Sequence, residues 1–103
     1  MATVPASDRD EALSAFWGAF AAGRYFEAHE ILEAYWVSYG GPDRDFFKGL
    51  IQAAVALHHA AEGNAAGARG VGARAQRHLN PYAAGHHGVD VARVLELLDS
   101  AVR

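Results

Sequence analysis

The sequence contains no cysteine, and this absence removes several kinds of site at once. Disulfides, thiolate-bound metals and thiol nucleophiles all need a cysteine sulfur. Long hydrophobic runs are missing too, since none approaches the roughly 20 apolar residues that a membrane span requires. Positive charge is not in excess either, because the formal net charge is -3. The chain therefore has no general attraction to nucleic acid or to anionic lipid, and we expect neither as a partner.

The composition that remains is typical of a small folded protein. The chain has 103 residues, of which 51% are hydrophobic, so it can build one core of modest size. Its first residues lack the basic start and apolar centre of a signal peptide, which favours a cytoplasmic location. We expect a short disordered lead over residues 1–6 and a single helical domain over residues 7–103.

Apolar residues recur at helical spacing along most of the chain. Leu13, Phe16, Trp17 and Phe20 follow one another at i, i+3, i+4 and i+7, as on the buried face of an amphipathic helix. Glycine, proline and asparagine interrupt the pattern at residues 23, 40–42, 63–64 and 80–81. No run alternates as a half-buried strand does. The predicted fold class is therefore all-α, a compact bundle of four to five antiparallel helices joined by short turns.

The expected second helix, about residues 25–38, carries the most informative polar side chains. His29 and Glu33 are i, i+4 neighbours on it, and Glu30 lies three residues before Glu33. Three side chains at this spacing can converge near one point. They share a broad face with aromatic rings, and ionisable groups on such a face are costly to desolvate unless they are paired. The helix therefore predicts a polar partner elsewhere in the chain.

The expected third helix, about residues 42–62, offers that partner. Gln52 and His59 are seven residues apart and share a face of it. If the second and third helices pack antiparallel, these two side chains can face His29 and Glu33. The sequence thus predicts a buried cluster of histidine, glutamate and glutamine between the two helices.

Three roles for this cluster stay open. His29, Glu33, His59 and Glu30 are candidate ligands of a divalent metal ion. In a catalytic site His29 and His59 would carry protons, Glu33 would act as base, and Gln52 would orient the reacting group. A buried hydrogen-bond network that only fixes the register of the helices needs the same residue types.

Other polar residues have simpler interpretations. Asp43 and Asp45 suit the positive end of the third helix's dipole. The pair His86-His87 falls in a loop that could cover the cluster, although most loop histidines are only solvated.

Three ordered motifs contain the residues of the predicted histidine, glutamate and glutamine cluster. They read Gly23-x-Tyr25-x-Glu27-Ala28-His29-Glu30-x-Leu32-Glu33-x-x-Trp36, Arg44-x-Phe46-Phe47-x-Gly49-Leu50-Ile51-Gln52-x-Ala54 and His59-x-x-x-Gly63-Asn64-x-x-Gly67-Ala68. Together with Gly88-Val89-Asp90, they resemble the bacterial and archaeal family called domain of unknown function 309, over about residues 16–95. The resemblance implies a compact all-helical domain with no established activity. The positions that match its motifs include Glu27, His29, Glu30, Glu33, Gln52, His59 and Asn64. Lys48 departs from the neutral polar residue expected there, and a cation disfavours a nearby metal.

Two hypotheses about function follow. The first is a soluble helical domain with a metal or small-molecule site between the second and third helices, and whether it is an enzyme is left open. The alternative is a noncatalytic, tetratricopeptide-like interaction module whose polar cluster is structural and which acts through a groove or a homodimer face.

Overall fold

The computed structural model describes residues 6–37 and 43–102. They form five α-helices, which are α1 (Ala6–Ala21), α2 (Tyr25–Trp36), α3 (Arg44–Ala61), α4 (Ala65–Leu79) and α5 (Val91–Val102). A short 3-10 helix, η1 (Asn80–Tyr82), follows α4, and the described residues contain no strand beyond one isolated bridge between His86 and Val89. The predicted all-α class is confirmed.

Two sequence predictions fall on residues that the structure does not describe. The helix-breaking segment Gly40-Gly41-Pro42 lies outside the described residues, and so does the predicted disordered lead apart from Ala6, where α1 begins. The division into a lead and a single domain over 7–103 stays a prediction.

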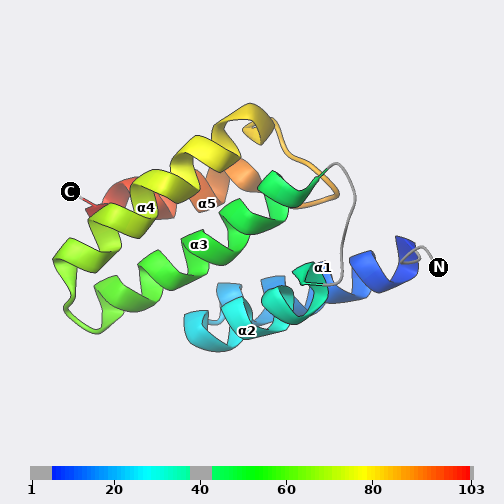
Figure 1. The fold of residues 1–103 in the computed structure, drawn as a ribbon, viewed down its shortest axis with the longest axis horizontal. Coiled ribbons are helices and arrows are strands. Elements are labelled where there is room, and N and C mark those ends of the chain that lie inside the picture. Colours follow the sequence, from blue (N-terminus) through cyan, green and yellow to red (C-terminus); the bar gives the residue numbers. More distant parts are fainter. Residues whose placement is uncertain (1–5, 38–42, 103) are drawn as a thin grey trace.

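Successive helices run antiparallel (Figure 1). α1 and α2 form one helical hairpin, α3 and α4 form a second, and α5 runs back beside the second hairpin. α3 contacts α2 on one side and both α4 and α5 on the other, which explains why it is apolar over most of its circumference. None of the described helices combines the length and hydropathy that crossing a bilayer requires.

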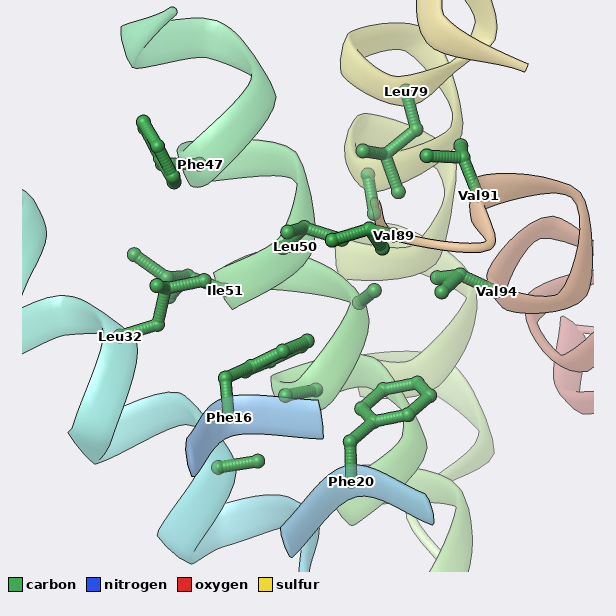
Figure 2. Close-up of a cluster of buried hydrophobic side chains, with 14 of the residues drawn as sticks. Phe16, Phe20, Leu32, Phe47, Leu50, Ile51, Leu79, Val89, Val91 and Val94 are labelled. Atoms are coloured by element: carbon green, nitrogen blue, oxygen red, sulfur yellow. The ribbon is translucent and has the colours of Figure 1, made fainter. Parts of the chain in front are cut away.

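The hydrophobic core joins side chains from all five helices. Figure 2 shows Leu32 of α2 on one side of α3, with Phe16 and Phe20 of α1 in front of α3. Val89, Val91 and Val94, from the loop before α5 and from α5 itself, lie on the other side. All six are buried, so removal of apolar surface from water holds the two hairpins and α5 together.

The same turn closes both hairpins. Gly23 and Gly63 have φ of +82° and +79°, a conformation that glycine adopts without steric penalty. After each helix a backbone N–H bonds five residues back, from Arg24 to the Ala19 carbonyl over 2.9 Å and from Asn64 to the His59 carbonyl over 2.8 Å. This hydrogen bond is typical of the glycine-terminated helix end.

A glycine also sets how closely α3 and α4 approach. A Cβ atom on Gly49 would lie 2.8 Å from Cγ of Leu79 and 2.9 Å from Cβ of His78, closer than real contacts allow. The face of α3 that carries Gly49 therefore packs directly against α4. Gln52, one turn further along, lies on the same face and is drawn toward α4 as well.

Candidate functional site

The predicted buried cluster between α2 and α3 is wrong. None of the described residues is a buried polar or charged one. On α2, His29 is half-buried while Glu30 and Glu33 are exposed. The Nδ1 of His29 donates to the carbonyl oxygen of Phe26 in its own helix, over 2.8 Å.

The two residues expected on α3 face the second hairpin instead. Nδ1 of His78 on α4 donates to Oε1 of Gln52 over 2.8 Å, and Asn64 Nδ2 lies 3.3 Å from Nδ1 of His59. His58 is the histidine that reaches toward α2, where its ring centroid lies 5.2 Å from that of Phe26. The physical reason is the close α3–α4 contact at Gly49, which commits the face carrying Gln52 and His59 to α4.

A different polar cluster forms where α3 begins. Nε2 of His87 donates to Oδ2 of Asp43 over 2.7 Å, and Nε2 of His86 donates to Oδ1 over 3.2 Å. One ligand-type atom from each of the three residues lies within 4.8 Å of the other two. The side chains are 18–30% exposed, so the cluster is partly shielded from water but reachable. We call Asp43, His86 and His87 the Asp–His–His cluster.

A tight turn presents the two histidines. His87 and Gly88 have φ of +49° and +76°, and the backbones of His86 and Val89 bond across the turn. Positive φ at both central residues is the signature of a type I′ turn, which usually carries asparagine and glycine. A left-handed histidine is unusual and stores strain, and such residues concentrate at functional sites. Val89 is buried and fixes the turn to the core.

The carboxylate of Asp43 is committed to the histidines rather than to its helix. Asp43 is the residue before α3, yet its side chain makes no capping hydrogen bond. Partial burial by itself raises the pKa of Asp43, but the hydrogen bonds from His87 and His86 and the charges of these histidines outweigh it. The pKa of this carboxyl therefore lies below its ordinary value of 3.8. Asp43 stays ionised and accepts both hydrogen bonds.

Aromatic rings surround the two imidazoles and limit their movement. The ring of Phe46 lies edge-on to His86 with centroids 4.8 Å apart, and that of Tyr82 lies 4.7 Å from His86. The ring of Phe47 stacks on His87 at 6.2 Å. These rings come from α3 and from η1, so two separate parts of the chain position the histidines.

The sequence contains local signals for this cluster. Asp43 also suits the dipole of α3, and a pair of loop histidines is also compatible with simple solvation, so neither signal by itself predicts the contact. Two adjacent histidines bounded by Gly85 and Gly88 indicate a tight turn that holds both rings in place. The separation of 43 residues between Asp43 and His86 hides their contact from any local pattern.

The fold and cluster together define a small all-helical domain with a two-histidine, one-carboxylate group on its surface. The chain belongs to the family described as "Domain of unknown function (DUF309)", whose model matches residues 13–71. That range includes Asp43 and ends before the two loop histidines.

One curated relative is the uncharacterized protein YpuF of Bacillus subtilis (strain 168). The two sequences are 43% identical over 79 residues, which cover 74% of this chain and 45% of YpuF. The chain thus spans less than half the length of this relative. No solved structure is a significant match to the chain.

Proposed function

We propose that this protein binds one divalent transition-metal ion through Asp43, His86 and His87. The observation that carries the proposal is the convergence of three potential ligand atoms within 4.8 Å of one another, from two segments far apart in sequence. Two further features support it. The side chain of Asp43 makes no capping hydrogen bond to α3, and His87 has a positive φ.

The distances in the cluster suit an ion after a small adjustment. Bonds of about 2.0–2.2 Å in a tetrahedral site place neighbouring ligand atoms roughly 3.3–3.6 Å apart. The histidine nitrogens now lie 2.7 and 3.2 Å from the carboxylate oxygens. An ion would replace the two Nε2 protons, so the pair now 2.7 Å apart would separate by about 0.6–0.9 Å and the pair now 3.2 Å apart by about 0.1–0.4 Å.

The donor set indicates which ions fit. Two imidazole nitrogens and one carboxylate oxygen suit zinc, iron, cobalt or nickel better than magnesium or calcium, which prefer oxygen ligands. Three protein ligands leave at least one coordination position for water or substrate, as in metal sites that act on a bound molecule. The partial exposure of all three side chains supports access from solvent.

A structural role is the alternative, and the 2.7 Å hydrogen bond from His87 to Asp43 favours it. In this case the cluster only fastens the α4–α5 loop to the start of α3. The noncatalytic, tetratricopeptide-like interaction module remains compatible with that role, because the two hairpins share one turn geometry. Homodimer formation also stays a prediction.

The experiment is a metal titration of EDTA-treated full-length protein, followed by thermal unfolding and by calorimetry. We expect Zn²⁺ or Ni²⁺ at about 100 times the dissociation constant to stabilise the fold by about 2.7 kcal/mol. His87→Asn should weaken binding by at least about tenfold, because it removes a ligand while asparagine tolerates the positive φ.

The matched control is His59→Asn, which removes a half-buried histidine outside the cluster. This variant should bind metal as the parent protein does. Metal that gives no stabilisation at about 1 mM, or that binds equally well to His87→Asn, would leave only the structural role.

A further inference from the structure

A hollow beside the Asp–His–His cluster has the character of a small-molecule site. It has a volume of about 480 Å³ and lies between α1 and the turn that precedes α5. On α1 it is lined by Asp10, Leu13, Ser14 and Trp17, which follow helical spacing and so form one stripe. Ligand pockets in proteins commonly measure about 300–1,000 Å³.

The lining combines an apolar wall with negative charge. Leu13 and the half-buried Trp17 supply apolar and aromatic surface, while Asp10 and Asp90 supply two carboxylates. Among the residues that the structure describes, no lysine or arginine lines the hollow. Arg9 donates to Oδ1 of Asp10 from Nη2 over 3.1 Å and from Nε over 3.2 Å. Because the Asp10 side chain is 65% exposed, water screens this ion pair and keeps it weak.

Asp90 caps α5 and also contributes negative charge to the hollow. Its Oδ1 accepts a hydrogen bond from the backbone N–H of Arg93 over 3.1 Å, which caps α5. The donor is an uncharged amide, so the carboxylate remains negative beside the hollow. Two carboxylates without a lining cation disfavour an anionic ligand and favour a positively charged one.

We propose that this hollow binds a small organic amine with an aromatic or branched apolar body. The ammonium group pairs with Asp10 and Asp90, and the body packs against Leu13 and Trp17. An indole ring also attracts an ammonium group through its π face. This site does not depend on a metal ion at the Asp–His–His cluster, although His87 lines the hollow as well.

The experiment uses EDTA-treated full-length protein carrying Trp36→Phe, so that Trp17 is the sole tryptophan and reports on the hollow. The probes are phenethylamine, 2-phenylethanol and 3-phenylpropionate, which share a ring and differ in charge. We expect a saturable change of Trp17 fluorescence with phenethylamine. The alcohol and the acid should bind more weakly than phenethylamine. Added salt should lower the affinity of phenethylamine, because it screens the attraction between charges.

Two sets of variants separate charge from shape. Asp90→Asn keeps a good helix cap and should raise the dissociation constant of phenethylamine roughly two- to fivefold, as expected for an exposed ion pair. Asp10→Asn should do the same, while Glu62→Gln, an equal charge change outside the lining, should have no effect. Ser14→Phe should block the hollow, whereas Ala15→Phe adds the same ring to an exposed neighbour outside the lining and should not.

Equal affinity for phenethylamine and 2-phenylethanol would overturn the proposal of an amine site. Unchanged binding in Ser14→Phe would overturn the location, and the absence of a saturable signal with phenethylamine would overturn the site itself. Because metal is removed beforehand, none of these outcomes decides whether the Asp–His–His cluster binds an ion.

Discussion

The histidines on the helices and the histidines in the loop meet very different partners. His29, His59 and His78 each contact an uncharged group, namely a backbone carbonyl or a side-chain amide. His86 and His87 instead share one ionised carboxylate that comes from a distant part of the chain. A helix presents its side chains at fixed intervals around one axis, whereas a turn can aim two adjacent side chains at one point.

This difference shows why residue type alone is a poor guide to a site. The helical histidines lie at the spacing of metal ligands, and carboxylates lie close to them in the sequence. They form no shared cluster, because Gln52 and His59 face α4 rather than α2. The loop histidines have no helical spacing at all, but Asp43 and a strained turn bring them together.

The largest effect is expected from Gly49→Ala, which breaks the packing that holds the helical residues in place. The added methyl group would lie under 3.0 Å from Leu79 and His78, so α3 and α4 must separate. We expect a loss of about 1–3 kcal/mol in unfolding free energy, measured by chemical denaturation.

Gly70→Ala is the matched control, because nothing lies within 4 Å of a Cβ at that position of α4. It should stabilise the helix by roughly 0.5–1 kcal/mol. If both alanine variants had the same stability, the close approach at Gly49 would not explain why Gln52 faces α4.

Asp43→Asn tests the loop region. It removes the charge that both histidines contact and should lower stability at neutral pH by roughly 1–2 kcal/mol. Because the pKa of Asp43 is lowered in the folded protein, its ionised form stabilises the fold above the unfolded pKa. This contribution is lost as the pH falls through the folded value.

The difference in stability between parent and Asp43→Asn should therefore shrink below about pH 4. Denaturation at a series of pH values, with EDTA present throughout, measures it. A difference that does not change with pH would contradict the charged contact between Asp43 and the two histidines.

A smaller effect should separate His87→Asn from His29→Asn. His87→Asn removes the 2.7 Å hydrogen bond to Asp43 and should destabilise the metal-free protein by about 1 kcal/mol. His29→Asn removes only a bond to a carbonyl of its own helix and should change stability by no more than about 0.5 kcal/mol. Equal effects would mean that the loop histidines are no more constrained than the helical ones.

Much of the fold could be predicted from local patterns. The breaks expected at residues 23 and 63–64 are helix ends where Gly23 and Gly63 have positive φ, and α2 begins at residue 25 as expected. These features depend on neighbours within a few residues, where propensity and capping act.

The sequence by itself determined the all-helical class, the hairpin turns and most of the buried face of α1, because helical periodicity and glycine conformation are local properties. Only the tertiary structure decided which polar residues meet. The rotation of α3 follows from the fit of Gly49 against Leu79, and the contact of Asp43 with His86 and His87 closes a loop of more than 40 residues. No pattern along the chain records either distance, since both depend on how separately formed helices pack.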